Sequence, residues 1–349
     1  MMIDRQPRRS RGPRRLAGAL LFGVLLALAA LVAAACGDGD DIDIIPPPGS
    51  PTAAPTPSAT AEPLPEPTEF RVAYINLMSP IALDATNTIP SDTFQQRLAV
   101  VVEELKAFKP DLVAFSEVTD TKAHGKVASV LAKELKMEPL YVRAKPWYAE
   151  STKEQNDAIA KSAGFEEGEL ILVNGTLFPN TEGEQKWLNP RTSEGEAAAA
   201  LWMRLKGPDS IGSIDVFVSH LTGTDARLRA QQAADFANFI AAKRGTGPVL
   251  VLGDLGDPPD SATVKVFLDA GLTDLFADSP LNTCCRESVV AEQPPTSARH
   301  DYIFSSGWQP AEVGIFAEKP KKLDDGTLVY ASDHNGVRAV FSIGLNNVP

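Results

Sequence analysis

One stretch decides the fold of this chain: Gly247-Pro248-Val249-Leu250-Val251-Leu252-Gly253-Asp254-Leu255-Gly256-Asp257-Pro258-Pro259-Asp260-Ser261. Its four consecutive apolar residues, bounded by turn formers, predict a short buried strand, and the acidic, Gly- and Pro-rich residues after it predict a loop. Asp254 then stands at the strand's C-terminal end, where a sheet delivers its functional side chains, and a carboxylate there suits metal or phosphate chemistry. The alternative is an acidic turn that leads into a helix capped by Ser261.

Apolar runs and helical patterns alternate along the rest of the body. Strands are expected at 70–77, 112–117, 170–173, 201–205, 214–221, 249–253, 301–304 and 337–342. Helices are expected at 92–108, 122–135, 225–242 and 262–270. Because strands and helices interleave, the fold class is α/β with helices packed on sheet faces. The pattern alone leaves the number of sheets open.

The N-terminus has the form of an export signal. Residues 1–15 carry six arginines and one acid, and an unbroken run of apolar or small residues fills 16–35. The run ends in Val32-Ala33-Ala34-Ala35-Cys36-Gly37, which resembles the lipobox of bacterial lipoproteins. That resemblance implies cleavage after residue 35 and attachment of a diacylglycerol to Cys36, although the usual leucine is replaced by Ala33. The alternative is an uncleaved anchor helix, and either one places the body outside the cell membrane.

A stalk and one domain follow the signal. Residues 36–69 contain nine prolines and almost no aromatic or branched core residues, so this segment is expected to be a disordered stalk. Residues 70–349 show no second low-complexity linker and no internal repeat, and we expect one domain there.

Charge and cysteine content narrow the possible functions. The chain has a formal charge of −12, and loss of residues 1–35 removes six arginines and one aspartate, which leaves −17. An acidic body argues against loose, charge-driven adhesion to DNA or anionic lipid, but a local phosphate site built around a cation remains compatible with it.

Beyond Cys36 only the adjacent Cys284 and Cys285 remain, and neighbouring cysteines rarely form an unstrained disulfide. A metal site at this pair is the alternative.

Polar residues mark the ends of the predicted strands. They are Asn76, Glu117, His220, Asp254 and Asp301, together with Asp333 and His334 just before the last strand. Strand ends are often polar merely because they leave the core. A set of this size, which includes two of the four histidines, favours a shared site.

These residues belong to motifs that follow one another in a fixed order. The motifs are Arg71-Val72-Ala73-Tyr74-Ile75-Asn76-Leu77, Pro110-Asp111-Leu112-Val113-Ala114-Phe115-Ser116-Glu117-Val118, Val218-Ser219-His220-Leu221 with Arg229 and Gln232, Gly253-Asp254-Leu255-Gly256-Asp257, Arg299-His300-Asp301-Tyr302-Ile303-Phe304 and Ser332-Asp333-His334. Together they resemble the endonuclease/exonuclease/phosphatase superfamily, whose members have the DNase I-like fold. Glu167-Gly168-Glu169-Leu170-Ile171-Leu172 resembles the central strand of that family, and Thr283-Cys284-Cys285 resembles a segment of some secreted members, which implies that the cysteines pack.

The resemblance implies a four-layer α/β/β/α sandwich with two facing mixed sheets, and Mg²⁺- or Mn²⁺-dependent hydrolysis of a phosphoester at the strand ends. Glu117 is the implied main metal ligand, assisted by Asn76 and Asp333. Asp254 is implied to orient or deprotonate the attacking water. His334, oriented by Asp301, and His220 on the other side are implied to contact the scissile phosphate, as suits imidazoles that titrate near neutral pH.

Single residues keep other interpretations. Asn76 fits a turn, Asp301 fits a cap or a partner of Arg299, and either histidine fits an ordinary strand end. Three positions also depart from the family pattern. Gly256 replaces an asparagine that would donate a hydrogen bond to the phosphate or nucleophile, Ser116 replaces a glutamine, and residues 197–200 are alanines where many members carry an arginine.

The sequence therefore predicts a metal-dependent phosphoesterase, anchored by lipid on the outer side of the membrane. The alternative is a non-catalytic binding or scaffold lipoprotein derived from the same fold. The expected partners are the membrane and a phosphate-ester substrate, which is nucleic acid, a lipid head group or a small phosphate ester, and no obligate protein partner is inferred. Loops at 144–164 and 181–196 are expected to shape the substrate groove.

Overall fold

A computed structural model describes residues 67–80, 93–191, 197–222, 225–279, 281–290 and 292–344. They belong to one compact unit that spans Pro63–Pro349. The predicted signal, Cys36 and nearly all of the predicted stalk lie outside the described residues, so these remain predictions. No described helix combines the length and apolar character needed to cross a bilayer.

The first sheet is mixed and contains the N- and C-terminal strands of the domain. Its order is β12 (Glu312–Phe316), β15 (Gly336–Ser342), β1 (Glu69–Asn76), β2 (Leu112–Thr121), β5 (Phe165–Val173) and β4 (Glu138–Lys145), with β3 (Gly125–Lys126) paired to β2. Strands β1 and β2 are parallel, and the other pairs are antiparallel. Because β15 runs against β1, the residues before β15 lie beside the C-terminal end of β1.

The second sheet is also mixed. Its order is β10 (Thr273–Asp274), β11 (Asp301–Ser306), β9 (Val249–Asp254), β8 (Ser213–His220), β7 (Ala199–Lys206) and β6 (Asn180–Trp187). Strands β8 and β9 are parallel and connected by a helix, whereas the remaining pairs are antiparallel. A separate pair, β13 (Lys321–Lys322) and β14 (Leu328–Val329), forms a short hairpin.

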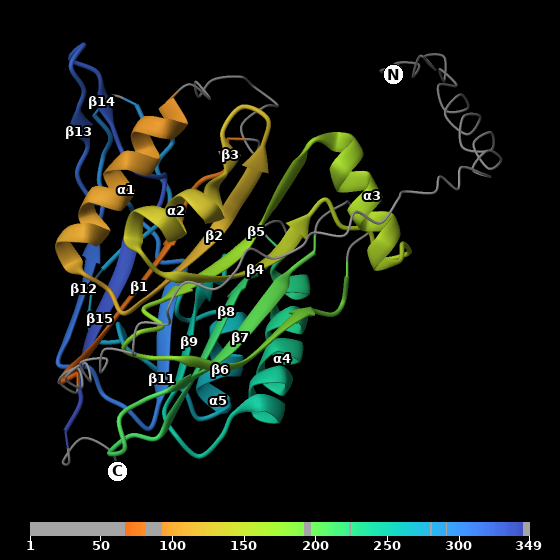
Figure 1. The fold of residues 1–349 in the computed structure, drawn as a ribbon, viewed down its shortest axis with the longest axis vertical. Coiled ribbons are helices and arrows are strands. Elements are labelled where there is room, and N and C mark those ends of the chain that lie inside the picture. Colours follow the sequence, from red (N-terminus) through yellow and green to blue (C-terminus); the bar gives the residue numbers. More distant parts are fainter. Residues whose placement is uncertain are drawn as a thin grey trace, which may run out of the picture. The chain divides into compact units, whose positions relative to one another are not determined.

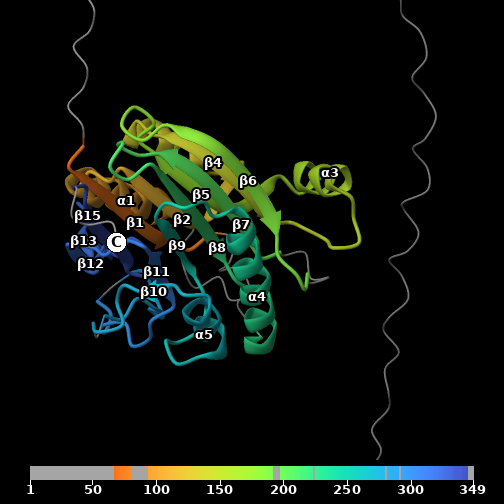
Figure 2. The ribbon, with the colours of Figure 1, turned by 90° about the horizontal axis from the view of Figure 1, so that it is seen from below.

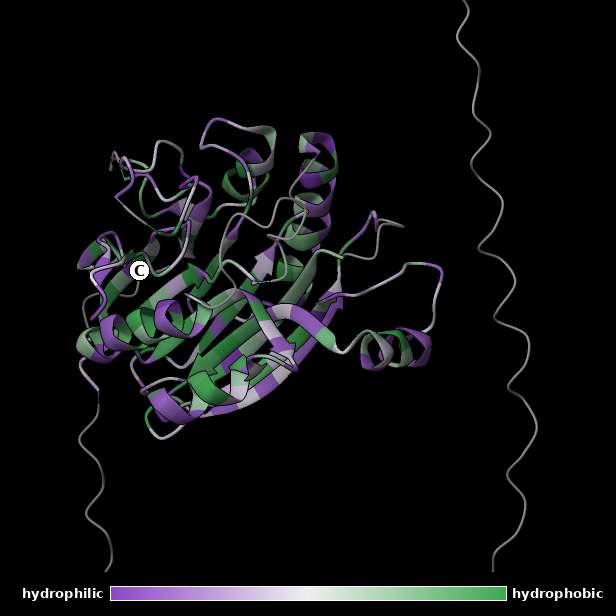
Figure 3. Ribbon diagram, turned by 90° about the horizontal axis from the view of Figure 1, so that it is seen from above, coloured by the Kyte–Doolittle hydropathy of each residue, from purple (hydrophilic) through white to green (hydrophobic). Residues whose placement is uncertain are grey.

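The two sheets face each other and carry helices on their outer faces (Figures 1 and 2). One apolar core lies between the sheets, a second joins the first sheet to α1 (Phe94–Phe108) and α2 (Val127–Leu135), and a third joins the second sheet to α4 (Ala226–Lys243) and α5 (Ala262–Asp269). Hydrophobic residues accordingly concentrate on the strands between the helices (Figure 3). The predicted four-layer α/β/β/α sandwich is confirmed.

Helix α1 shows why these helices form where they do. Phe94, Leu98, Val101 and Leu105 recur at helical spacing and are buried against the first sheet. The helix ends at Phe108, and the cap residue Lys109 has a left-handed backbone (φ 56°) and donates its amide to the carbonyl of Leu105.

Several elements differ from the sequence prediction. Helix α2 begins at Val127 rather than at residue 122, because β2 continues to Thr121 and turns back into β3. Strands β4, β6 and β12 were not predicted, since their sequences are polar or interrupted. The stretches 144–164 and 181–196 are also more regular than the predicted loops, because α3 (Lys153–Ala163) and most of β6 lie within them.

A β-bulge in the middle of the first sheet sets the backbone of Glu117. The pairing of β2 with β5 shifts register between Phe115 and Val118, and Glu117 has a left-handed backbone with φ 58°. A glutamate rarely adopts this conformation, and such strain concentrates at functional sites. The bulge re-aims the Glu117 side chain at the end of the sheet.

Glu169 lies on β5 beside this bulge and is only 1% exposed. Its Oε2 atom has no hydrogen-bond partner among the described residues, and Ser116 offers the carboxyl group one hydrogen bond. Burial raises the pKa of Glu169 to about 8, against the opposing effect of His220. The carboxyl group is therefore neutral at pH 7.

Replacement of Glu169 by Gln should flatten the pH dependence of stability. The neutral acid is favoured in the folded chain, so the contribution of Glu169 to stability is fully present below its unfolded pKa of about 4.3 and falls as the pH rises toward 8, by up to about 1.4 kcal/mol per pH unit. Denaturant unfolding of both proteins in EDTA at pH 5 and pH 8 measures the difference. Glu138→Gln, at an exposed position of β4, is the control and should keep the wild-type slope. Equal slopes for Glu169→Gln and wild type would contradict the assigned pKa.

Candidate active site

Three predicted site residues lie side by side at one end of the second sheet. Asp254 at the end of β9 is in register with His220 at the end of β8 and with Asp301 at the start of β11. The parallel pairing of β8 with β9 and the antiparallel pairing of β9 with β11 bring these three backbone positions to the same edge. This arrangement excludes the interpretation of Asp301 as a partner of Arg299, whose guanidinium pairs with Asp274.

The first sheet contributes Asn76 and Glu117 to the same place. The Asn76 amide nitrogen donates to Glu117 Oε1 at 3.0 Å and to Asp254 Oδ2 at 3.1 Å, so it joins the two sheets. Its carbonyl oxygen accepts the amide of Met78 at 2.9 Å, and the amide of Ser79 donates to Glu117 Oε2 at 2.7 Å. Asn76 is 1% exposed and positions both carboxylates.

His334 is held by Asp301. Nδ1 of His334 lies 2.8 Å from Asp301 Oδ2, and both side chains are buried. Burial alone would lower the pKa of His334, but the carboxylate of Asp301 and, beyond it, those of Asp333 and Asp254 raise this pKa well above 6.5. Burial also raises the pKa of Asp301. The imidazole holds the proton of the pair, because three carboxylates face it.

Asp254 lies between the two imidazoles. Its Oδ2 atom is 3.7 Å from Nε2 of His220 and 3.7 Å from Nε2 of His334, and its Oδ1 atom accepts the amide of Gly256 at 2.8 Å. Burial opposes ionisation, but His334, His220 and the hydrogen bond from Asn76 together hold the pKa of Asp254 below its ordinary value. Asp254 is therefore a carboxylate at neutral pH and accepts hydrogen bonds.

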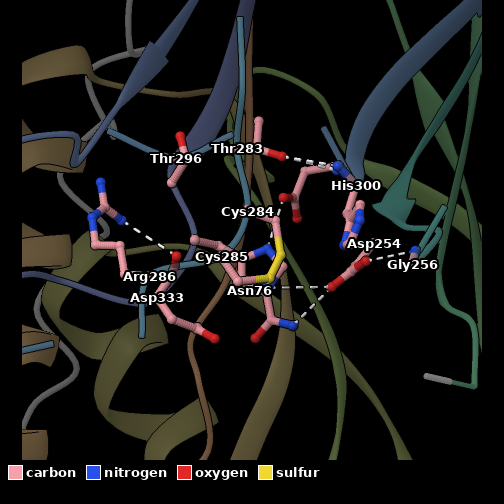
Figure 4. The surroundings of a disulfide bond; sticks show 12 residues. Asn76, Asp254, Gly256, Thr283, Cys284, Cys285, Arg286, Thr296, His300 and Asp333 are labelled. Carbon is pink, nitrogen blue, oxygen red and sulfur yellow. Dashed lines mark hydrogen bonds and ion pairs between the residues drawn. A yellow bond between two sulfur atoms is a disulfide. The ribbon is translucent and has the colours of Figure 1, made fainter. Parts of the chain in front are cut away.

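Asp333 approaches from the loop before β15. Its carboxylate points toward the amide of Asn76 in Figure 4. Arg97 of α1 is 2% exposed, and its guanidinium donates to the backbone oxygens of Leu77 and Met78. Burial lowers the pKa of Arg97 to about 10, and Asp333 and Glu117 oppose that shift, so this cation lies near both acids.

The donor set suits a hard divalent cation. Four carboxylates, those of Glu117, Asp254, Asp301 and Asp333, converge with the neutral amide of Asn76. Close carboxylates repel one another unless a cation offsets their charge, and oxygen ligands suit Mg²⁺ or Mn²⁺. Ligand atoms of Asp254, Asp301 and His334 lie within 4.8 Å of one another. The predicted ligands Glu117 and Asp333 do not belong to this group, and the amide nitrogen of Asn76, the third predicted ligand, donates to two carboxylates.

Gly256 is packed against a helix residue. It has φ 64°, and a Cβ atom built there would lie 3.0 Å from Cδ and 3.4 Å from Nε of Arg229. Arg229 in turn pairs with Asp257 at 2.5 Å, and Gln232 bonds to the backbone and side chain of Thr222. Arg229 and Gln232 thus fix the loops after β8 and β9.

Arg97, Glu169 and Thr283 also belong to this site and were not predicted from the sequence. The sequence pattern could have indicated Arg97, because it is a charged residue on the apolar face of α1. It could also have indicated Glu169, because it is a charged residue at the start of an apolar run. Thr283 had none. Its hydroxyl accepts the backbone amides of His300 and Asp301, a contact that only the tertiary structure creates (Figure 4).

The cysteines differ from the sequence expectation. Cys284 and Cys285 form a disulfide, whereas their adjacent positions made such a bond unexpected. Sγ of Cys285 also lies 3.6 Å from Nε2 of His334. The pair closes no long loop, so the fold is still held by its packed layers, and Cys284 is fully buried in agreement with a packing role.

Comparison with known proteins agrees with this geometry. The sequence matches the model of the Endonuclease/Exonuclease/phosphatase family over residues 87–334, a range that holds every predicted site residue of the domain except Asn76. No curated protein sequence matches the chain significantly.

Solved structures share the fold at low sequence identity. An endonuclease/exonuclease/phosphatase family protein from Bacteroides thetaiotaomicron has a TM-score of 0.61 and 16% identity, over 80% of this chain and 100% of its own. A mannosyl-6-phosphatase from the same species has a TM-score of 0.60 and 16% identity, over 78% and 100%. D. rerio TDP2 complexed with a single-stranded DNA product has a TM-score of 0.56 and 16% identity, over 79% and 99%.

The family match covers most of the chain, and the fold and the order of the site residues agree with it. This chain belongs to the endonuclease/exonuclease/phosphatase family.

Proposed function

We propose that this protein is a divalent-metal-dependent phosphoesterase. The observation that carries the proposal is the convergence of Glu117, Asp254, Asp301 and His334 at one end of two facing sheets, linked by Asn76. Residues 217 positions apart, from Glu117 to His334, meet there although nothing in the apolar cores requires acids or imidazoles at these places. Repulsion between the carboxylates and the burial of charged groups both lower the stability of the fold. A catalytic role explains why these residues are nevertheless gathered here.

Glu117 and Asp333 would hold Mg²⁺ or Mn²⁺, with Asn76 keeping Glu117 in place. When bound, the cation would neutralise the negative charge that develops on the phosphoryl oxygens and on the leaving oxygen. The strained backbone at Glu117 supports this assignment, because strain of this kind concentrates at functional sites and the bulge places the carboxylate beside Asn76.

The remaining residues activate the attacking water and contact the phosphate. Asp254, ionised and fixed by two hydrogen bonds, accepts a proton from the attacking water or orients it. His334, protonated and held by Asp301, donates a hydrogen bond to the scissile phosphate. His220, with a side chain 20% exposed, contacts the phosphate from the opposite side of Asp254. No covalent intermediate is needed.

The substrate class is a phosphate ester. The similar structures include a mannosyl-6-phosphatase and TDP2 with a single-stranded DNA product, which supports this broad class and does not choose within it. Nucleic acid, a lipid head group and a small phosphate ester are the candidates. A panel that spans the three classes would distinguish them.

Gly256 favours a second candidate, a non-catalytic binding or scaffold protein. In family members with asparagine at this place, the amide would donate to the phosphate or nucleophile, and loss of such a donor commonly costs about 3 kcal/mol of transition-state stabilisation. The backbone amide of Gly256 is occupied by Asp254.

We also propose that the domain is displayed outside the cell membrane on a lipid anchor. The arginine-rich N-terminus, the apolar run and Cys36 at its end support this placement.

Activity is expected to depend on a divalent metal and on the site residues. Full-length protein carrying Cys36→Ser, purified in detergent, should hydrolyse bis(p-nitrophenyl) phosphate with Mg²⁺ or Mn²⁺ and lose this activity in EDTA. His334→Ala should lower kcat by about 10²- to 10⁴-fold, because it removes a group that contacts the phosphate, and Glu117→Ala should abolish metal-dependent activity. His124→Ala and Glu138→Ala, at positions away from the site, should match wild type. Activity that is insensitive to EDTA or to both site variants would contradict the proposal.

Gly256→Asn tests whether the missing amide limits the rate. Asparagine tolerates the left-handed backbone of this position better than most residues, and Arg229 needs to shift by only a few tenths of an ångström. If the amide regains its role, kcat should rise by up to about 10²-fold. Gly256→Ala adds the Cβ without the amide and should not raise kcat. Activity in Gly256→Asn alone would assign the natural chain to the binding class, and no activity in either protein would end the enzyme hypothesis.

Lipidation can be tested directly in a bacterial host. Wild-type chain should incorporate labelled fatty acid and lose residues 1–35, whereas Cys36→Ser should do neither. N-terminal sequencing and radiolabel counting provide the two measurements. An unlabelled wild-type chain that retains residues 1–35 and sediments with membranes would instead show an uncleaved anchor helix.

A further inference from the structure

The segment that carries the disulfide is fixed between the two loops of the candidate site. On one side, the amides of Thr283 and Cys284 bond to the carbonyl of Ala298, and the amide of Ala298 bonds back to Cys284. On the other side, the amide of Arg286 bonds to the carbonyl of Asp333 at 2.9 Å. The backbone of the pair is therefore held by hydrogen bonds that do not involve sulfur, and it would keep its place with the sulfur–sulfur bond open.

The sulfur atoms lie against the catalytic imidazole. Sγ of Cys285 is 3.6 Å from Nε2 of His334, the nitrogen that does not bond to Asp301. One ligand atom from each of Cys284, Cys285 and His334 lies within 4.8 Å of the others. Cys284 is fully buried, whereas Cys285 is exposed and accessible to a reductant.

The separation of sulfur and nitrogen matches that of ligands on one zinc ion. With a Zn–S bond of about 2.3 Å and a Zn–N bond of about 2.0 Å, tetrahedral geometry places the two ligand atoms about 3.5 Å apart. Cys285 and His334 are already at 3.6 Å. Thiolate and imidazole are the ligands that thiophilic cations prefer, in contrast to the oxygen ligands around Glu117.

We propose that Cys284, Cys285 and His334 form a redox-gated site for a thiophilic divalent cation such as Zn²⁺ or Cd²⁺. In the disulfide form the site is closed, because neither sulfur can become a thiolate. In the dithiol form the two sulfurs and Nε2 of His334 supply three ligands, and water completes the shell.

The opening step is a thiol–disulfide exchange with a dithiol reductant. The reductant passes two electrons and two protons to the Cys284–Cys285 bond, which breaks to give two thiols, and the reductant becomes a disulfide. The incoming cation then displaces the two thiol protons and the proton on Nε2 of the His334 imidazolium, and all three leave to solvent.

Occupation of this site would take Nε2 of His334 away from the substrate. The reduced, metal-loaded protein would thus be inhibited, and the oxidised protein would not. This consequence rests on the proposed phosphoesterase function, whereas cation binding does not.

Cadmium binding measures the site without reference to activity. Full-length protein carrying Cys36→Ser, in which Cys284 and Cys285 are the only cysteines, is reduced with dithiothreitol, desalted under argon and titrated with Cd²⁺. We expect one Cd²⁺ per chain, with a thiolate-to-cadmium charge-transfer band, and no such band for the oxidised protein. Equal Cd²⁺ binding by the two redox forms would overturn the proposal.

Variants identify the ligands. Cys285→Ser, at an exposed position, and His334→Ala should each weaken Cd²⁺ binding by the reduced protein about tenfold or more. His124→Ala is the matched control and should leave the affinity unchanged. If His334→Ala binds Cd²⁺ as tightly as the parent, the two thiols act alone and the three-ligand site is wrong. Circular dichroism of each variant verifies that it is folded.

An activity arm separates this inference from the proposed function. With Mg²⁺ present, Zn²⁺ at one equivalent should inhibit the reduced protein and spare the oxidised one. Cadmium binding that needs His334 in a protein without phosphoesterase activity in either redox state would support the site and contradict the proposed function. Activity in both states with equal sensitivity to Zn²⁺ would contradict the redox gate.

Discussion

The candidate site depends on one side chain that bridges the two sheets. The Asn76 amide donates to Glu117 on the first sheet and to Asp254 on the second, at 3.0 and 3.1 Å. The sheets meet mainly through an apolar core, which fixes their spacing but gives no preference for how acids at their ends align. A buried amide with two carboxylate partners supplies that preference, since each donor left unpaired would carry a desolvation cost.

Local strain and buried charge gather around this bridge. Glu117 has a left-handed backbone, Glu169 beside it is buried with a raised pKa, and Arg97 is a buried cation near two acids. Each feature opposes stability by itself, and the surrounding cores offset the sum. Their concentration within one end of the sandwich is typical of a site kept for function rather than for folding.

His334 belongs to two chemical environments at once. Its Nδ1 faces Asp301, in a region of oxygen ligands suited to a hard cation, and its Nε2 faces both Asp254 and the sulfur of Cys285. The same imidazole therefore links phosphate chemistry to thiol chemistry. This link arises because the segment 283–286 bonds to the loops on either side of the site, so the sulfurs cannot move far from the ring.

The sequence by itself determined the α/β class, the strands that carry Asn76, Glu117, His220 and Asp254, and the family resemblance that implied four layers, because these rest on local hydrophobic periodicity and short ordered motifs. It did not give β4, β6 and α3, whose polar patterns lack that periodicity, or the disulfide and the stacked Trp147 and Trp187. Only the tertiary structure decided which side chains meet. Residues distant along the chain meet at the bulge of Glu117, at the hydrogen bonds of Asn76 and at the contact of Cys285 with His334. Strand register and sheet packing bring these residues together, and the preferences of single residues do not encode either of them.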